Sequence, residues 1–192
     1  MLIKKDIFYN NNFGDRIMSK SSKDQMDQDE KKVLSELVKN SNENIDTISK
    51  HCGFSRQKTW RFIKQLEAKK LIWGYTAIFD EEKIGQKHFI LMVKRTTKQL
   101  EEVTANRIIS RKIEDIAAEN GITIESSFYV HGEYDWVITF STDNIKHAKK
   151  FSDSVIAFHP GVIEKITIMQ TLMFIRKHYI LNPDRKKLKE FL

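Results

Sequence analysis

Residues 45–70 read IDTISKHCGFSRQKTWRFIKQLEAKK, and this stretch decides the fold of the N-terminal half. Ile48 and Cys52 lie four positions apart, which puts both on one face of a short helix. Gly53 then supplies a turn, because glycine takes a positive φ at no steric cost. Ser55 is a good N-cap for a further helix. Two short helices joined by such a turn predict a helix-turn-helix.

A third helical pattern precedes this pair, and Asp46 is the expected N-cap of the middle helix. The pattern runs from Asp27 to about Lys39, with one apolar stripe made of Val33, Leu34, Leu37 and Val38. Residues 1–25 hold no sustained apolar period and predict a disordered extension. The native start is open among Met1, Met18 and Met26.

From residue 71 onward the period changes from helical to β-rich. A linker strand is expected at 73–87, followed by a βαββαβ module at 88–175. The fold class is therefore α+β: a helix-turn-helix domain of the winged type at 26–72 and a ferredoxin-like domain. The basic tail, 176–192, suggests a short helix or a frayed end. Within the module we expect strands at 89–96, 122–130, 134–141 and 162–174, and helices at 100–120 and 144–158.

Alternation along the first strand of the module separates two sheet faces. Ile90, Met92 and Lys94 lie on one side, with Phe89, Leu91 and Val93 on the other, and Val137, Thr139, Ile166, Ile168 and Gln170 add to the pattern. Two helices cover only one face of a four-stranded sheet. We therefore expect sheet-to-sheet homodimers that bury about 800 Å² per partner, with tetramers or octamers left open.

The last helix of the helix-turn-helix carries the candidate DNA contacts. Between residues 55 and 65 there are four basic side chains and no acidic one. Such a helix enters the major groove, where Arg reads guanine, Gln reads adenine and Lys neutralises phosphate. The alternative is a packing module whose basic face is simply hydrated. The candidates are Ser55, Arg56, Gln57, Lys58, Trp60, Arg61 and Lys64.

Composition narrows the remaining function classes. The net charge is +7, a weak pointer to nucleic acid. One cysteine, Cys52, allows no internal disulfide and no thiol cluster, and the six histidines lack metal-ligand spacing, so neither a metal nor a cofactor is expected. Apolar runs are too short to span a bilayer, and the N-terminus lacks the apolar core of a signal peptide. We expect a cytoplasmic protein.

Four segments resemble the Lrp/AsnC (feast/famine) family of transcription regulators. They are DEKKVL at 29–34, CGFS at 52–55, LE at 66–67 followed by LI at 71–72, and GYTAIFD at 74–80. The resemblance implies a regulator that binds promoter DNA as a dimer or larger ring and senses a small effector. Lys58, Trp60 and Phe62 depart from the small hydroxyl residue and arginines usual in the family. The target sequence therefore does not carry over from relatives.

A glycine–acidic–tyrosine–aspartate turn connects the second and third strands of the module. The spacing alone predicts a hairpin turn, with Gly132 in the left-handed region and Asp135 bonded to the local backbone. The resemblance implies that this turn binds an amino acid between dimers. Carried over residue by residue, the effector candidates are His131, Gly132, Glu133, Tyr134 and Asp135.

Two rival functions use the same architecture. Siroheme decarboxylases resemble it and hold a tetrapyrrole in the sensing fold, but the four-cation helix and the linker Gly74–Thr76 argue against that enzyme. A DNA-free subunit that senses amino acids and acts through protein contacts is the other. No phosphate loop, nucleophile–base pair or metal cluster points to catalysis.

Overall fold

The computed structural model describes residues 20–184, 186 and 189. The chain divides into two compact units, Met1–Thr76 and Ala77–Leu192, and each is taken by itself. Mixed helix and sheet content confirms the α+β class.

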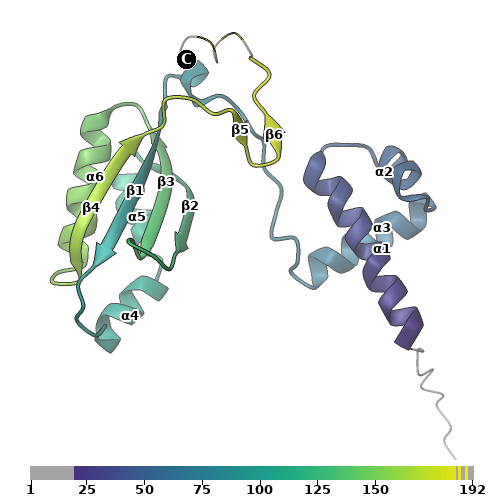
Figure 1. Ribbon diagram of the computed structural model, residues 1–192, viewed down its shortest axis with the longest axis horizontal. Coiled ribbons are helices and arrows are strands. Elements are labelled where there is room, and N and C mark those ends of the chain that lie inside the picture. The colour runs from purple at the N-terminus through teal and green to yellow at the C-terminus, as the bar shows by residue number, and fades with distance from the viewer. Residues whose placement is uncertain (1–19, 185, 187–188, 190–192) are drawn as a thin grey trace, which may run out of the picture. The chain divides into compact units, whose positions relative to one another are not determined.

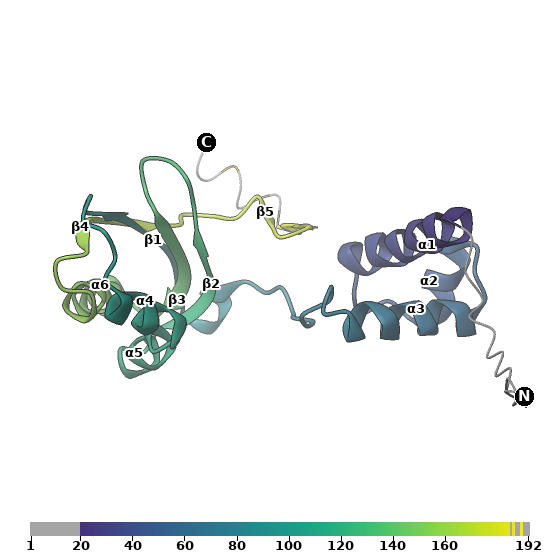
Figure 2. The ribbon, with the colours of Figure 1, turned by 90° about the horizontal axis from the view of Figure 1, so that it is seen from below.

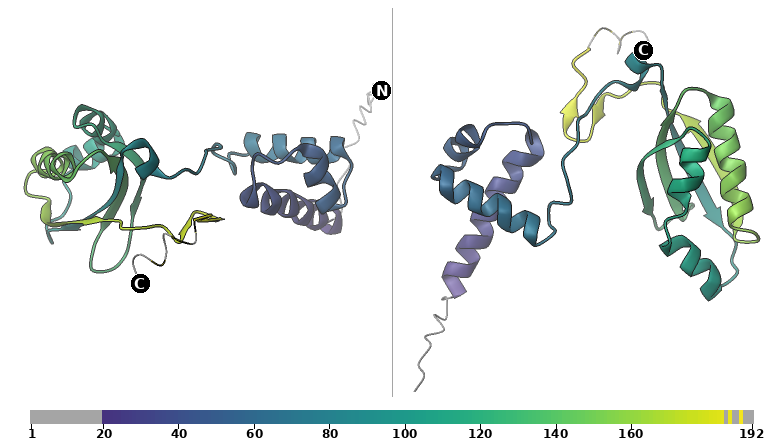
Figure 3. Two further views of the ribbon diagram at one scale, coloured as in Figure 1. Left: turned by 90° about the horizontal axis from the view of Figure 1, so that it is seen from above. Right: turned by 180° about the vertical axis from the view of Figure 1, so that it is seen from behind.

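The first unit is a three-helix module built on one small apolar core. Its helices are α1 (Lys20–Lys39), α2 (Ile45–Cys52) and α3 (Arg56–Ala68), as Figure 1 shows. Helix α1 crosses the other two, and one face of each helix turns inward (Figure 3). This arrangement confirms the predicted helix-turn-helix. The buried apolar side chains of this core are Val33, Leu37, Ile48, Phe62 and Leu66.

Two helix starts differ from the sequence-based expectation. Helix α1 begins at Lys20, so residues 20–25 are helical rather than part of a disordered extension; residues 1–19 lie outside the described part. Helix α2 is capped by Asn44 and not by Asp46, because the Asn44 side chain accepts the N–H of Thr47 at 2.9 Å. Asp46 falls in the first turn, where a carboxylate still favours the helix dipole.

The linker contains no strand among the residues that the structure describes. Residues 72–80 have no assigned helix or strand, and a short 3-10 helix, Glu81–Ile84, follows them. The expected linker strand, and with it a wing, is therefore not formed within the chain, because an extended segment becomes a strand only beside a partner. Trp73 in this segment is 95% exposed.

The second unit is a four-stranded antiparallel sheet with helices on one face (Figure 2). The strand order β2-β3-β1-β4 confirms the ferredoxin-like arrangement. The expected helix 100–120 is broken in two, with Arg111 in the left-handed region at φ 56° between the halves. Its elements are β1 (Lys87–Arg95), α4 (Glu102–Ile109), α5 (Ile113–Glu119), β2 (Thr123–Tyr129), β3 (Trp136–Thr142), α6 (Ile145–Phe158) and β4 (Ile163–Gln170).

The two sheet faces differ as the alternation predicts. Phe89, Leu91 and Val93 are buried against the helices. Trp136 of β3 belongs to the same core and is 8% exposed. The opposite face is only half-covered: Ile90 stands opposite Thr139, and Met92 opposite Val137. Ile166 and Ile168 pair with Val93 and Leu91, so both belong to the helix-covered face.

Residues 176–181 form a hairpin, and the basic stretch 185–192, on which the expected short helix or frayed end rests, lies mostly outside the described residues. Strands β5 (Arg176–Lys177) and β6 (Ile180–Leu181) pair antiparallel through a two-residue turn. The Asn182 side chain donates to the carbonyl of Phe174 at 2.8 Å, and Pro183 follows it. Among residues 20–184, no helix is long and apolar enough to cross a membrane.

Candidate nucleic-acid interface

The turn between α2 and α3 sets the angle between these two helices. Gly53 ends α2 in the left-handed region at φ 70°, as predicted, and the N–H of Phe54 returns to the carbonyl of Ser49 at 2.9 Å. The buried Ser49 hydroxyl also lies 2.9 Å from the Thr59 hydroxyl, which joins α2 to α3. These bonds hold the helix pair rigidly, as a groove-reading element requires.

The start of α3 is suited to an anion. Ser55 caps the helix, as predicted, by accepting the N–H of Lys58 at 3.2 Å. The first turn of α3 contains no acidic residue, so the positive end of its dipole is not offset locally. Backbone N–H groups at such an end bind phosphate oxygens.

Five of the candidates share one exposed face of α3. Their spacing of i, i+1, i+4, i+5 and i+8 places them in adjacent turns of the helix. Trp60 is 56% exposed, and the Lys64 ammonium lies 5.9 Å from its ring centroid. The indole therefore lies mostly in solvent rather than covering the edge of its own unit. The exposed set is Arg56, Gln57, Trp60, Arg61 and Lys64.

The ion pairs that this face makes with acidic residues are open to solvent and therefore weak. Arg56 lies 3.5 Å from Asp46, and Lys64 lies 2.7 Å from Glu67. Pairs of this kind contribute about 0–1 kcal/mol each, so a phosphate can replace the carboxylate. Arg61 makes no ion pair with any residue in the described part of the chain.

Lys58 differs from the other basic residues of α3. Its ammonium lies 2.8 Å from Asp29 Oδ2, in a pair that is only partly exposed, and 4.0 Å from the Phe54 ring centroid. The hydrogen bond from Lys58 is the main reason why the pKa of the Asp29 carboxyl lies below its ordinary value. This lysine bonds to its own unit, so we leave it out of the proposed DNA contacts.

The turn between β2 and β3 carries the effector candidates and projects from the sheet on the side away from the helices (Figure 2). His131, Gly132 and Glu133 are exposed. The Tyr134 hydroxyl lies 3.2 Å from that of Thr167 on β4. The expected left-handed conformation of Gly132 is wrong: its φ is not positive, and the turn is wider than a two-residue hairpin.

Asp135 ties this turn to the neighbouring strand. Its carboxylate accepts the N–H of Arg95 at 2.7 Å, and its own N–H donates to the carbonyl of Val93 at 2.9 Å. The predicted backbone bonding is present: the Asp135 carboxylate bonds to β1, and the Asp135 carbonyl accepts the N–H of Val130 across the turn at 2.9 Å. The carboxylate therefore has a structural partner before any ligand arrives.

Arg95 is a residue that the sequence analysis missed. Its Nε is buried with no hydrogen-bond partner among the described residues. It follows a register shift in the β1–β4 ladder after Lys94, and it bonds the turn through Asp135. The sequence signal that could have identified Arg95 is its place as a basic residue at the end of a strand whose apolar residues alternate. Because an unpaired buried guanidinium N–H is costly, this atom is suited to a ligand acceptor.

Comparison with known proteins agrees with this geometry. No family model matches the chain. Over 138 residues it is 25% identical to the HTH-type transcriptional regulator FL11 of Pyrococcus abyssi, covering 71% of this chain and 83% of that protein.

Solved structures share the fold. An AsnC family transcriptional regulator from Agrobacterium tumefaciens matches with a TM-score of 0.59 at 17% identity, over 82% of this chain and 97% of that one. A transcriptional regulator of Neisseria meningitidis, solved as a complex with L-methionine, matches with a TM-score of 0.61 at 17% identity, over 83% and 97%. The predicted resemblance to the Lrp/AsnC family is thus confirmed at the level of the fold.

Proposed function

We propose that this chain, which has the fold of the AsnC family regulators, is a DNA-binding transcriptional regulator that reads double-stranded promoter DNA with α3. One observation carries the proposal: α3 presents Arg56, Arg61 and Lys64 on one exposed face, with no acidic side chain in its first turn. A helix that served only to pack its own unit would not require basic residues gathered on one exposed face. We infer a non-enzymatic role and a cytoplasmic location.

The purified chain is first used to select DNA fragments from the genome. Its binding to the selected DNA is then measured at several salt concentrations. Arg61→Gln should weaken binding and lower the slope of log affinity against log salt by about 1 for each bound α3 helix, because one phosphate contact per helix is lost. Lys146→Gln is the matched control, since this exposed lysine on α6 removes the same charge from the other unit. No binding at about 50 mM salt, or equal effects of the two variants, would contradict the proposal.

We further propose that an amino acid or similar small effector binds beside the β2–β3 turn. The buried Arg95 Nε supplies a donor for a carboxylate, and the exposed Glu133 supplies an acceptor for an ammonium group. The structurally similar Neisseria protein was solved as a complex with L-methionine, which supports an amino acid as the class of ligand to test.

Calorimetric titration with a panel of L-amino acids tests the effector. Arg95→Met should abolish the heat of the best ligand, whereas Lys98→Met, an exposed cation beyond the same strand, should leave it unchanged. No heat from any amino acid in the wild-type chain would remove the effector while leaving the DNA proposal standing.

A homodimer through the open sheet face completes the proposal. Half-covered apolar side chains on this face, among them Ile90, Met92 and Val137, favour a second copy as the cover. A two-fold dimer places its α3 helices about 34 Å apart and so predicts a pseudo-palindromic site. Met92→Glu should shift the sedimentation mass toward the monomer, while Lys87→Glu, at the exposed start of β1, should not.

A further inference from the structure

The indole of Trp60 is the part of the exposed α3 face that phosphate binding and ion pairing do not explain. It is 56% exposed and lies about one turn after the Ser55 cap. In a helix-turn-helix, the N-terminal residues of this helix are the ones that reach base edges. The residues of α3 that are buried in the helical unit are Thr59, Phe62 and Leu66, and Trp60 is not among them. Packing of its own unit therefore does not account for this side chain.

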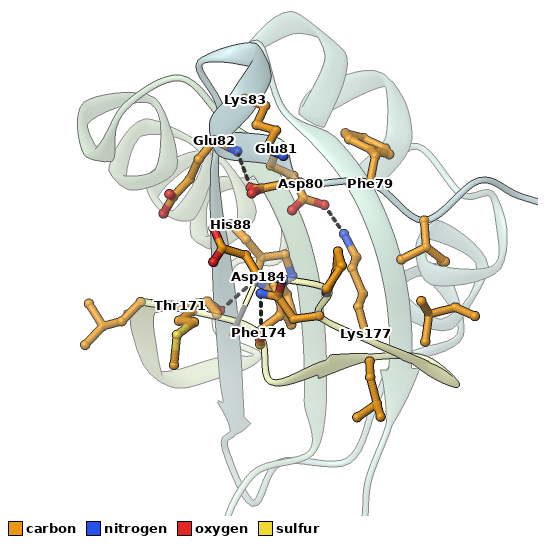
Figure 4. Close-up of a pocket in the computed structure, with 17 residues that line it drawn as sticks. Phe79, Asp80, Glu81, Glu82, Lys83, His88, Thr171, Phe174, Lys177 and Asp184 are labelled. Carbon is orange, nitrogen blue, oxygen red and sulfur yellow. Dashed lines mark hydrogen bonds and ion pairs between the residues drawn. The ribbon is translucent and has the colours of Figure 1, made fainter. Parts of the chain in front are cut away.

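A second contact between aromatic rings and a lysine, in the sheet unit, is made by a buried ammonium group. Phe79 and Phe174 line a cavity of about 290 Å³, and the Lys177 ammonium lies 5.5 Å and 5.1 Å from their ring centroids (Figure 4). That ammonium also bonds Glu81, in a pair largely removed from solvent, so it is held within the fold. By contrast, the Trp60 indole and the lysine beside it are both exposed. This pair is open to a partner from outside the chain.

The neighbours of Trp60 on the exposed face decide which kind of partner fits. An exposed aromatic residue is common on protein surfaces and by itself assigns nothing. Here, however, Arg56 and Lys64 lie one turn before and one turn after the indole, and Arg61 follows it directly. An apolar protein surface laid over the indole would take these three cations out of water, which is costly. DNA would instead meet them with phosphates, so the charge around Trp60 favours DNA.

The base edges of the major groove offer one kind of apolar group to an indole. Guanine, adenine and cytosine present hydrogen-bond donors and acceptors there, and thymine alone adds a methyl group at C5. An indole face laid over a donor or an acceptor leaves that group without a partner, which costs free energy. Laid over a methyl group, it removes the apolar surface of both from water.

We propose that Trp60 is a specificity-determining residue, whose indole packs on the 5-methyl group of one thymine in each half-site. This inference rests on the proposed binding of DNA by α3. It goes further because it names a base that the helix selects, whereas the cations on the same face hold the helix in the groove.

The test removes the methyl group from the DNA and leaves the hydrogen-bonding groups of the base in place. Each thymine of the selected DNA is replaced in turn by deoxyuridine, in both half-sites together, and the affinity of the full chain is measured at about 50 mM salt. At one position the wild-type chain should bind about fourfold more weakly for each methyl group removed, because one apolar carbon is no longer buried. The slope of log affinity against log salt should stay the same, since no charge changes.

Two variants assign the methyl contact. Trp60→Ala should bind the thymine and the deoxyuridine DNA with equal affinity, because nothing then packs on the methyl group. Trp73→Ala is the matched control, since it removes another exposed indole of the same unit that lies outside α3. It should keep the preference of the wild-type chain for the methyl group. Both side chains are exposed, so neither change removes a core residue.

Three results would overturn the proposal. If the wild-type chain binds the selected DNA but is insensitive to every substitution, Trp60 reads no thymine, and the regulator proposal still stands. If the methyl preference persists in Trp60→Ala, or is lost equally in Trp73→Ala, the contact does not belong to Trp60. If the chain binds no DNA at all, both proposals fall, so failure of this inference is distinguishable from failure of the proposed function.

Discussion

The Lys58 ammonium and the Asp29 carboxylate, 2.8 Å apart, join the first turn of α3 to α1. Asp29 is buried, and the Lys58 ammonium lies over the Phe54 ring, 4.0 Å from its centroid. One of the four cations on α3 therefore stabilises the helical unit itself, and the remaining three face solvent. Stability and DNA binding can accordingly be separated by mutation.

Lys58→Gln should lower the free energy of unfolding by about 1 kcal/mol, because the partly buried pair with Asp29 is lost. Its salt slope for DNA binding should stay that of the wild type, in contrast to Arg61→Gln. Urea unfolding and binding at several salt concentrations measure the two effects. A salt slope lowered as much in Lys58→Gln as in Arg61→Gln would instead place this lysine on phosphate.

Asp29→Asn should destabilise the chain at neutral pH, and the difference from wild type should vanish in acid. The pKa of Asp29 in the folded state lies below its unfolded value, chiefly because of the bond from Lys58. Its contribution is therefore present above the unfolded pKa and is lost as the pH falls through the folded pKa. Urea unfolding of both proteins, from about pH 7 down to about pH 3, measures it. A difference independent of pH would contradict the ion-pair explanation.

Gly53→Ala should destabilise the chain by about 1–2 kcal/mol, because φ of +70° is strained for any residue with a Cβ. Gly132→Ala is the matched control: its φ is not positive, and nothing lies within 4 Å of the added Cβ. Thermal unfolding should separate the two variants. Equal losses would mean that the turn at residue 132 adopts a different conformation in solution.

Asp135→Ala should cost about 1–3 kcal/mol of stability, because the N–H of Arg95 then loses its acceptor in a partly buried place. Glu133→Ala, two residues away and exposed, should change stability by less than about 0.5 kcal/mol. Chemical unfolding without any effector gives both values. A neutral Asp135→Ala would show that water replaces the carboxylate.

The fold was predictable where a local sequence pattern is compatible with only one local structure. Gly53 and Ser55 define the helix-turn-helix by their own conformations, and alternation along β1 places Phe89, Leu91 and Val93 inside. Helix starts were harder to predict because adjacent polar residues compete for one cap: Asn44 takes the role expected of Asp46. The tail hairpin depends on Asn182 bonding to Phe174, eight residues earlier, which no periodicity reveals.

The candidate site was predictable in outline only. Residue type and spacing identified the exposed face of α3, but not that Lys58 bonds to a carboxylate 29 positions earlier. Arg95 was missed for the same reason. Its role depends on two segments that tertiary structure brings together, because Asp135 of the β2–β3 turn lies beside Arg95 of β1.

The unequal solvent exposure of the three tryptophans gives the two units different optical signatures. Trp60 and Trp73 are 56% and 95% exposed in the helical unit, whereas Trp136 is 8% exposed in the sheet unit. Indole fluorescence shifts to longer wavelength in polar surroundings, so the folded helical unit already emits like an unfolded chain. Unfolding of the sheet unit will dominate the shift through Trp136, and quenching by added DNA will report on Trp60. A Trp136→Phe chain would thus emit from the helical unit alone.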